Sequence, residues 1–371
     1  MKWVKLEDIA EVIEGQSPKS EFYNSEGLGI PFFQGKADFG EKYPSVSTWC
    51  IKPTKIAHEG DILFSVRAPV GPTNIANERC CIGRGLAAIR VGAEIDRSYL
   101  RYYFSKVEQK ISDSGRGSTF NSITQKDLKN LKIPLPSLSE QRAIVAKLDR
   151  AQRLIDIDRQ MLAKYDALIQ SVFLDMFGDP VRNEKGWEVR KLGDVGKVQT
   201  GKTPSTKVPE FFIGDIPFVT PSDLGKREIS PTRFLSNEGL GYSKSVRKGA
   251  TMVCCIGATI GKVGIATETS GFNQQINTIE WKRGAVTDEY GYIALKLLEN
   301  EIKRNAKSTT LPILKKSKFQ EILVPVPDIK SQKHFTEIFK KIDSEIKSAE
   351  QFMQKSESLF LSLVQQAFSK T

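Results

Sequence analysis

One short run of this sequence has the residue types and spacing of a phosphate-binding site. Residues 196–204 read GKVQTGKTP, so that Gly196, Gly201, Lys202 and Thr203 satisfy the P-loop pattern G-x-x-x-x-G-K-[ST]. In a P-loop the backbone N–H groups cradle nucleotide phosphates, the lysine binds the terminal phosphates and the hydroxyl binds Mg²⁺. A helix must also begin at the lysine. Nucleotide hydrolysis is therefore one hypothesis, and the rest of the chain has to support it.

Other residues suited to catalysis are sparse. His58 and His334 are the two histidines and lie far apart in the sequence, so a nucleophile–base triad is hard to place. No cluster of carboxylates is ready to hold Mg²⁺ for a nuclease, and no run has the F-x-G-x-G or [DN]-P-P-[FYW] pattern of an adenine methyltransferase. The five cysteines include two adjacent pairs and no C-x-x-C, which disfavours a zinc site. We therefore expect a non-catalytic chain with no metal or cofactor of its own.

The net charge points to a polyanionic partner. The chain has 371 residues and a formal charge of +11, and neutralising phosphates releases counterions. A merely lysine-rich surface is the alternative, because net charge concerns association rather than fold. No apolar run reaches the roughly 18 residues of a membrane helix, and the start, MKWVKLEDIAEVIEG, carries acids where a signal peptide is apolar. We expect a cytoplasmic protein that does not contact a membrane.

The first half of the chain aligns with the second. KLEDIAEVIEGQSP (5–18) aligns with KLGDVGKVQTGKTP (191–204). STFNSITQKDLKNLKIPLPSLSEQ (118–141) aligns with TTLPILKKSKFQEILVPVPDIKSQ (309–332). A repeat of this length predicts two copies of one structural unit.

The repeat also bears on the P-loop pattern. The segment of the first half that aligns with GKVQTGKTP is AEVIEGQSP, residues 10–18. This segment keeps Gly15 but has Ala10 in place of the first glycine and Gln16 in place of the lysine. Prolines follow Lys202 closely, and proline is accepted only in the first turn of a helix. The run therefore predicts an exposed loop in which Lys202 and Thr203 contact a DNA phosphate, with nucleotide binding as the alternative.

Each half divides into a β-rich part and a long helix. Short apolar runs broken by Gly and Pro, such as ILFSV and INTIEW, predict compact, mostly β domains. Within them, residues 99–111 and 292–304 each predict one amphipathic helix. The four predicted parts are a first domain at 1–136, a first helix at 137–179, a second domain at 180–327 and a second helix at 328–371.

A heptad pattern marks both long helices. Ser137 and Glu140 form a capping box before the first one, and Gly178 and Pro180 mark its end. Seam residues then recur in steps of four and three, with Asp158 as the polar member of the first seam. Two matched heptad helices in one chain most simply pair with each other, which predicts an α+β fold of two β-rich domains on a coiled coil. The seams are Ile144, Leu148, Ala151, Ile155, Asp158, Leu162, Tyr165, Ile169, Val172 and Met176, and Phe335, Phe339, Ile342, Ile346, Ala349, Met353, Ser356, Phe360, Leu363 and Ala367.

Two β-rich modules on one coiled coil, in a basic chain, suggest a reader of two DNA half-sites. Dimeric DNA readers place two modules at a spacing that the dimer scaffold sets. Because the two modules here are unequal, they should read an asymmetric, two-part sequence. A stand-alone two-site DNA binder, such as a regulator, is the alternative.

Several longer runs carry a resemblance to a known family. DILFSVRAPVGPTNIANERCCIGRGLAAIR (61–90) in the first module, and the runs within 200–224 and 256–279 in the second, look like target recognition domains. GSTFNSITQKDLKNLKIPLPSLSEQRAIV (117–145) and FLDMFGDPVRNEKGWEVRKLGDV (173–195) are similar to the runs that lead into the first helix and into the second half. Over nearly its full length, the chain resembles the specificity subunit of type I restriction–modification enzymes.

The resemblance implies the architecture and the partners. It implies two pseudo-twofold-related target recognition domains separated by two long antiparallel helices, two docked methyltransferase subunits, and motor-nuclease subunits in the full complex. The double-stranded DNA target would be bipartite and asymmetric. N6-adenine methylation and ATP-driven cleavage would belong to the partners, which would bind S-adenosylmethionine, ATP and Mg²⁺. The run before the first helix ends in the pair Glu140-Gln141, and the matching run before the second helix lacks this Glu-Gln pair. This departure suggests that the second helix holds its partner subunits less strictly.

Candidate DNA contacts are polar residues in loops beside strands. Arginine reads guanine best, and asparagine or glutamine reads adenine, whereas lysine and threonine more often contact phosphates. For each residue the alternative is a solvated side chain or a hydrogen bond within the fold. The candidates are Gln16, Lys19, Gln34, Lys36, Arg67 and Arg84 in the first module, and Lys202, Thr203, Thr220, Ser222, Lys262 and Gln274 in the second.

Overall fold

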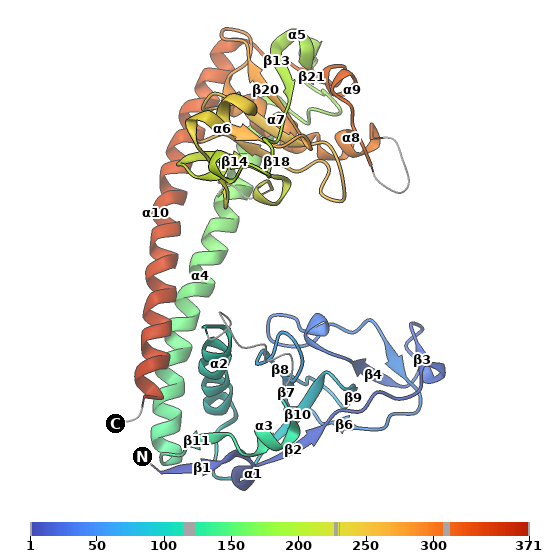
Figure 1. The fold of residues 1–371 in the computed structure, drawn as a ribbon, viewed down its shortest axis with the longest axis vertical. Coiled ribbons are helices and arrows are strands. Elements are labelled where there is room, and N and C mark those ends of the chain that lie inside the picture. Colours follow the sequence, from blue (N-terminus) through green and yellow to red (C-terminus); the bar gives the residue numbers. More distant parts are fainter. Residues whose placement is uncertain (1, 114–122, 226–228, 230, 307–311, 370–371) are drawn as a thin grey trace. The chain divides into compact units, whose positions relative to one another are not determined.

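The structure, a computed structural model, describes residues 2–113, 123–225, 229, 231–306 and 312–369. The chain forms two compact units (Figure 1). The first comprises residues 1–159 and 351–371, and the second comprises residues 160–350. Two long helices, α4 (Leu138–Phe177) and α10 (Ile329–Ala367), each begin in one unit and end in the other.

The first unit is built on two sheets with a short strand pair. Strands such as ILFS (Ile62–Ser65) are buried along their whole length, which accounts for their continuous apolar runs. One antiparallel sheet has the order β2 (Ala10–Glu14), β10 (Leu86–Val91), β7 (Ile62–Ser65), β8 (Thr73–Ile75). The other sheet has the order β3 (Tyr23–Asn24), β5 (Trp49–Cys50), β4 (Ile30–Phe33), β9 (Cys80–Ile82), β6 (Ile56–Ala57), and β1 (Trp3–Lys5) pairs with β11 (Lys132–Pro134). The helices are α1 (Leu6–Ile9), α2 (Arg97–Asp113) and α3 (Gln125–Lys129), with 3₁₀ turns η1 (Ser20–Phe22) and η2 (Lys36–Asp38).

The second unit repeats this plan, except that the described residues of its second sheet form four strands, with no counterpart of β3. Its antiparallel sheet has the order β13 (Gly196–Thr200), β20 (Ile276–Trp281), β17 (Thr251–Cys254), β18 (Val263–Ile265). Its mixed sheet has the order β15 (Phe234–Leu235), β14 (Ile216–Val219), β19 (Ser270–Phe272), β16 (Lys244–Val246), and β12 (Val189–Lys191) pairs with β21 (Leu323–Pro325). The helices are α5 (Leu192–Val195), α6 (Asn237–Tyr242), α7 (Asp288–Leu297), α8 (Glu299–Arg304) and α9 (Lys316–Gln320), with 3₁₀ turns η3 (Pro209–Phe212) and η4 (Pro221–Asp223). The predicted repeat is therefore confirmed at the level of topology.

One predicted helix is wrong in its extent. The sequence predicted a single helix over 292–304, but the structure ends α7 at Leu297 and starts α8 at Glu299. Leu298 lies between them with ψ of 9°, outside the α-helical range, and is buried. Leu295, Leu298 and Ile302 are all buried, so the hydrophobic periodicity continues across the break and does not reveal it. Its counterpart in the first unit, α2, is one continuous helix as predicted.

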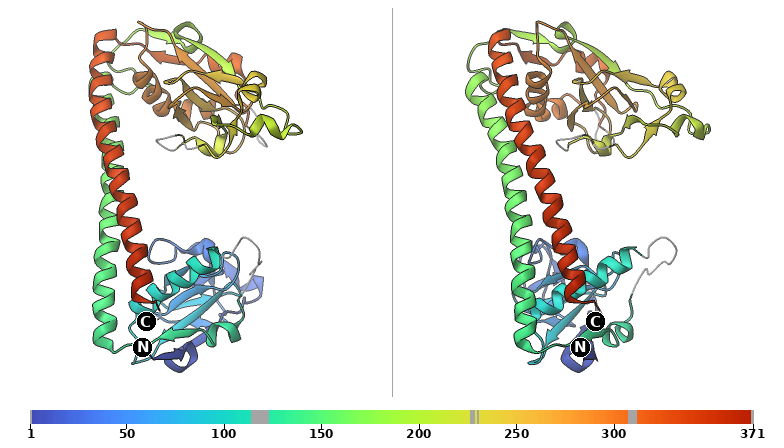
Figure 2. Two further views of the ribbon diagram at one scale, coloured as in Figure 1. Left: turned by 60° about the vertical axis from the view of Figure 1, so that its left-hand side comes forward. Right: turned by 90° about the vertical axis from the view of Figure 1, so that its left-hand side faces the viewer.

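The long helices pair along the predicted seams, and every seam residue is buried or half-buried. In the first unit, Leu148 near the start of α4 shares a core with Leu363 near the end of α10. In the second unit, Phe173 near the end of α4 packs against Phe335 near the start of α10, with ring centroids 5.5 Å apart. Within each unit the helices lie side by side (Figure 2). The pairing is therefore antiparallel.

The polar members of the two seams meet. The Ser356 hydroxyl donates a hydrogen bond of 2.8 Å to the Asp158 carboxylate, which is 8% exposed. Arg159 and Glu357, the next residue on each helix, form an ion pair at 3.6 Å. A buried polar contact satisfies its groups only in one alignment of the helices, so this contact favours that register.

A buried glutamine attaches each long helix to its own unit. Gln141 and Gln332 are both 0% exposed. Gln141 accepts from the backbone N–H of Asp96 at 2.7 Å and donates to the carbonyls of Glu94 and Pro136. Gln332 makes the same three bonds with Thr287, Ala285 and Pro327. The start of each helix is thus fixed against the loop that precedes α2 or α7.

The caps of the two helices differ. Ser137 and Glu140 form the predicted capping box, and the hydrogen bond from the Ser137 hydroxyl holds the pKa of Glu140 below its usual range. In the second helix Asp328 takes this role, accepting from the backbone N–H groups of Lys330 and Ser331. The bond from Ser331 N–H is the main reason that the pKa of Asp328 is lowered. A different side chain therefore caps the helix that lacks the Glu-Gln pair.

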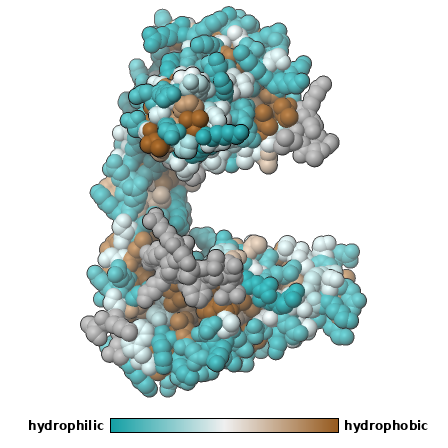
Figure 3. Space-filling model, in the orientation of Figure 1, coloured by the Kyte–Doolittle hydropathy of each residue, from teal (hydrophilic) through white to brown (hydrophobic). Residues whose placement is uncertain are grey.

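The cores lie inside each unit, and the visible surface of both is largely hydrophilic (Figure 3). All five cysteines are free and buried. In the described part of the chain, no helix has the length and apolar character needed to cross a membrane.

Candidate nucleic-acid interface

Three strand ends of the first unit converge on one loop, residues 83–85, between β9 and β10. The backbone N–H of Gly83 donates to Phe33 at the end of β4, at 2.8 Å. Gln16, after β2, donates to Ile82 at 3.0 Å, and Val66, after β7, donates to residue 85 at 3.0 Å. We call this arrangement the first junction (strands labelled in Figure 1).

Glycine is required where these backbones cross. A Cβ atom on Gly15 would lie 2.1 Å from the carbonyl oxygen of Gly83. A Cβ atom on Gly85 would lie 2.2 Å from the carbonyl oxygen of Gln34. Real side chains do not approach backbone atoms this closely, so only glycine permits the contact. The close backbone contacts of the junction therefore depend on these glycines.

Four of the six predicted residues of the first module line one hollow at the junction. Gln34, Lys36, Arg67 and Arg84 surround a space of about 210 Å³, and all four side chains are exposed. Gln16 is also exposed and takes part through its backbone. The strand pairing thus brings together loops that are far apart in the sequence.

Two serines of this hollow were not predicted. Ser17 accepts a hydrogen bond from the backbone N–H of Arg84 at 3.3 Å, and Ser65 donates to the backbone carbonyl of Arg67 at 3.1 Å. Both hold the backbone of an arginine that was predicted. Their nearness to Gln16 and Arg67 in the sequence was the available signal.

The hollow carries positive charge that is not paired at short range. Within the described residues, no carboxylate lies within ion-pair distance of the cations of Lys36, Arg67 and Arg84, although the charge of Lys36 partly offsets the raised pKa of Glu108. The nearby Asp38 carboxylate instead accepts from the backbone N–H groups of residues 34 and 35. Cations without a carboxylate partner favour binding of a phosphate or of a base edge rich in acceptors. Lys19 stands outside this group, exposed in a turn, with Nζ 3.9 Å from Glu21.

The second unit has a matching arrangement, the second junction, around residues 273–275 between β19 and β20. Asn273 N–H donates to Val219 at the end of β14, at 3.1 Å. Lys202, after β13, donates to Phe272 at 3.0 Å, and Cys255, after β17, donates to residue 275 at 2.8 Å. These bonds reproduce those of the first junction one for one.

Three predicted residues of the second module meet at this junction. The Thr203 hydroxyl donates to the side-chain oxygen of Gln274 at 2.5 Å, and the exposed Lys202 precedes it on the same loop. Thr220 and Ser222 follow β14, but their hydroxyls lie 2.8 Å apart, and Thr220 also donates to Asp223. Thr220 and Ser222 therefore form hydrogen bonds within the fold, which was the alternative to a DNA contact. Lys262 lies apart, in the turn before β18, with its stem against Gly225.

The P-loop hypothesis does not hold. The run that carries the pattern forms strand β13 followed by a loop, and the next helical element is the short 3₁₀ turn η3. The backbone N–H groups of Gly201 and Lys202 already donate to Ile276 and Phe272. They are therefore unable to cradle a phosphate, and no helix begins at the lysine. The pattern matched residue types without the backbone geometry that gives the motif its function.

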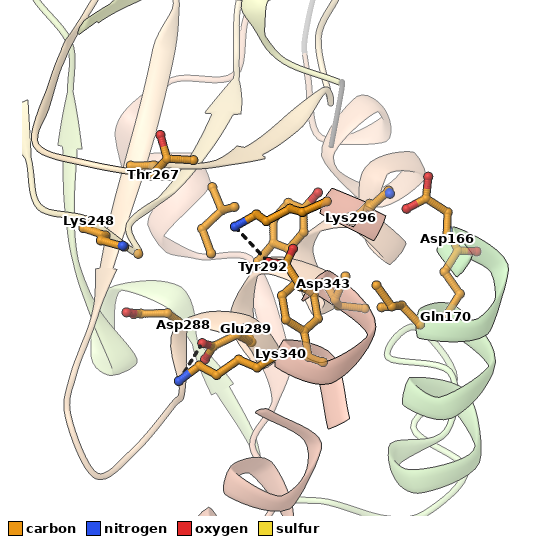
Figure 4. A pocket seen from close by; sticks show the side chains of 17 residues that line it. Asp166, Gln170, Lys248, Thr267, Asp288, Glu289, Tyr292, Lys296, Lys340 and Asp343 are labelled. Atoms are coloured by element: carbon orange, nitrogen blue, oxygen red, sulfur yellow. Dashed lines mark ion pairs between the residues drawn. The ribbon is translucent and has the colours of Figure 1, made fainter. Parts of the chain in front are cut away.

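A larger cleft in the second unit is less suited to a polyanion. It encloses about 410 Å³ and is lined by four lysines and four carboxylates (Figure 4). Lys340 pairs with Glu289 at 3.6 Å, and Lys347 pairs with Asp343 at 3.1 Å. Because its opposite charges balance, this cleft offers less attraction to phosphates than the junctions do. Among the described residues, no group of three or more His, Cys, Asp or Glu side chains is placed to hold a metal ion.

Known proteins resemble this chain over most of its length. The family model for the type I restriction modification DNA specificity domain matches residues 1–164 and 184–354. The MjaX type I restriction enzyme specificity subunit of Methanocaldococcus jannaschii is 49% identical over 155 residues, which cover 42% of this chain and only 36% of that protein. The MjaIX specificity subunit of the same organism is 26% identical over 364 residues, which cover 87% of this chain and 82% of that protein.

A solved structure has the same fold. The S subunit of a type I restriction–modification system from M. genitalium superposes with a TM-score of 0.52 and 20% sequence identity, covering 100% of this chain and 97% of that one. The family match includes both β-rich regions and most of both helices. The two domains and the paired helices are those predicted. The chain therefore belongs to the type I restriction–modification DNA specificity family, as a non-catalytic specificity subunit with DNA-recognition domains.

Proposed function

We propose that this chain recognises a bipartite, asymmetric DNA sequence, with one half-site read by each unit. The observation that carries the proposal is the pair of junctions. Both are held by the same backbone hydrogen bonds, yet they present different side chains at matched places. A shared scaffold with different exposed groups suits two readers of different sequences.

The twelve predicted residues are proposed as DNA contacts, in two classes. The glutamines and arginines among them are candidates for reading base edges, because their side chains are exposed and lie at the junctions. The lysines and threonines, Lys202 and Thr203 included, are candidates for phosphate contacts that position the duplex, and Ser222 can contact either a phosphate or a base. We also propose recognition domains at 1–136 and 180–327, and spacer helices at 137–179 and 328–371.

The same proposal gives the chain its partners. It directs two methyltransferase subunits and motor-nuclease subunits to the bound DNA, and those subunits bind S-adenosylmethionine, ATP and Mg²⁺. Apolar side chains on the outer faces of the helices support docking of a partner in each unit. Leu154 and Phe352 in the first unit are 47% and 59% exposed, and Leu168 in the second is 45% exposed. Large exposed apolar side chains that recur along a helix are typical of interaction surfaces.

Exchange of one module tests the two-reader proposal. Residues 180–327 are replaced by the corresponding domain of a relative, and the methylated sequence is mapped in cells that also express the methyltransferase subunit. One half of the sequence should change while the other half stays, because each unit has a hydrophobic core of its own. If both halves change together, the two-reader proposal is wrong. If the chain binds DNA but does not co-purify with methyltransferase subunits, it is the stand-alone binder instead.

A further inference from the structure

The two junctions can be compared position by position. Because loops 83–85 and 273–275 make matching backbone hydrogen bonds, their central residues occupy the same place in the two units. That residue is Arg84 in the first unit and Gln274 in the second. Each is exposed. The matched place therefore holds a guanidinium in one unit and a carboxamide in the other.

The backbone of Arg84 is fixed, while its guanidinium forms no hydrogen bond or ion pair with another described residue. Gly83 and Gly85 leave no side chain on either side, and a Cβ atom at either position would press on the backbone of residue 34. Ser17 accepts from the N–H of Arg84 at 3.3 Å. The guanidinium has no ion-pair partner among the described residues. It retains its planar set of donors, which matches the two acceptors O6 and N7 on the major-groove edge of guanine.

The carboxamide of Gln274 is oriented by one neighbour. Its oxygen accepts from the Thr203 hydroxyl at 2.5 Å. A carbonyl oxygen has two lone pairs, so it can accept a second hydrogen bond while the amide nitrogen donates. Accepting from N6 and donating to N7 is the pairing that glutamine makes with adenine. The Thr203 contact holds the amide for this pairing without blocking it.

We propose that Arg84 reads a guanine in the half-site of the first unit and that Gln274 reads an adenine in the half-site of the second. The bases lie at matched places because the residues do. This inference rests on the proposed recognition of a two-part sequence, and it adds which residue reads which kind of base.

The test uses the chain in complex with its methyltransferase subunits and a duplex that carries the mapped sequence. Each guanine of the first half-site is replaced in turn by 7-deazaguanine, which lacks the N7 acceptor. One replacement should weaken wild-type binding by about 10- to 100-fold and should leave the Arg84→Ala complex unaffected. Each adenine of the second half-site is replaced by 7-deazaadenine and tested against Gln274→Ala in the same way. Arg79→Ala is the matched control, since Arg79 is an exposed arginine at the opposite end of β9.

The outcomes separate this inference from the proposed function. If Arg84→Ala weakens all duplexes equally and lowers the salt dependence by about one unit, Arg84 contacts a phosphate, and its assignment is overturned. The assignment also fails if the first half-site has no guanine, or if every base replacement weakens DNA binding by the Arg84→Ala complex further. The same criteria apply to Gln274 and adenine. A wild-type complex with no preference between the mapped sequence and unrelated DNA would instead overturn the proposed function.

Discussion

The buried glutamine at the start of α4 should be essential to the stability of the first unit. Gln141→Met keeps the length and volume of the side chain but removes its amide. The N–H of Asp96 then loses its acceptor, and the carbonyls of Glu94 and Pro136 lose a donor. A buried polar group left without a partner costs roughly 1–3 kcal/mol. Buried carbonyl groups tolerate a missing partner better than an N–H group does. We therefore expect Gln141→Met to lower the free energy of unfolding of the first unit by about 2–4 kcal/mol in total.

Native-state hydrogen exchange measures this loss unit by unit. At about 1.36 kcal/mol for each factor of ten, protection of the slowest amides in the first unit should fall by about 30- to 1000-fold. Amides of the second unit should keep their protection. Gln332→Met should produce the reverse pattern, because Gln332 makes the same three bonds in the second unit. Gln152→Met is the control, because Gln152 lies on the same helix and, among the described residues, its side chain bonds only to Asp156 one turn away.

Two results would refute this reasoning. A loss of protection below about fivefold for Gln141→Met would mean that the orphaned groups find other partners. A loss that appears equally in both units would mean that the glutamine supports a single cooperative structure rather than its own unit. Either result is visible in the same peptide maps.

Three further perturbations test the energetics of the first unit. Arg90→Ala should destabilise it by about 3 kcal/mol in urea unfolding, because the Asp61 carboxylate, 4% exposed, loses its two-bond partner; an unchanged midpoint would contradict this. Replacing Asp158 and Ser356 together by leucine should leave the melting temperature equal or higher, while Asp158→Leu alone should cost at most about 1 kcal/mol; a lower melting temperature of the double variant would show that the polar contact is needed for stability itself. Burial raises the pKa of Glu108, with Lys36 partly offsetting it, so ionisation of Glu108 should lower stability as the pH rises through this raised pKa. Glu108→Gln should remove that loss from the pH dependence of the urea midpoint, and an unaltered pH dependence would refute it.

The sequence predicted the helices and strands well because their signals are local. Apolar residues in steps of three and four mark a helix face wherever it packs, and every predicted seam position is buried or half-buried. The capping box of Ser137 and Glu140 depends on three residues of spacing and was found as predicted. The break at Leu298 was missed because the apolar positions Leu295, Leu298 and Ile302 keep helical spacing across it.

The candidate site was only partly predictable. Residue type selected Gln34, Arg67 and Arg84, but their meeting in one hollow depends on the parallel pairing of β4 with β9, which no local pattern encodes. Ser17 was missed because its role is to accept from a residue far along the chain. The P-loop pattern failed for the opposite reason. It records residue types, whereas phosphate binding depends on whether backbone N–H groups such as that of Lys202 are unoccupied.

The backbone construction of the junctions has a consequence for how such a protein can change its target. The contacts that hold the first junction come from main-chain atoms, from glycines and from the side chains of Ser17, Asp38 and Ser65. The exposed side chains of residues 34, 67 and 84 form no hydrogen bond or ion pair with another described residue. Exposed substitutions of this kind usually change stability by no more than about 0.5 kcal/mol. A library randomised at these positions should therefore consist mostly of folded proteins, in which selection acts on sequence preference alone. Mutational tolerance and DNA specificity would then reside in the same few side chains, and new preferences could arise by single steps without a stabilising change elsewhere.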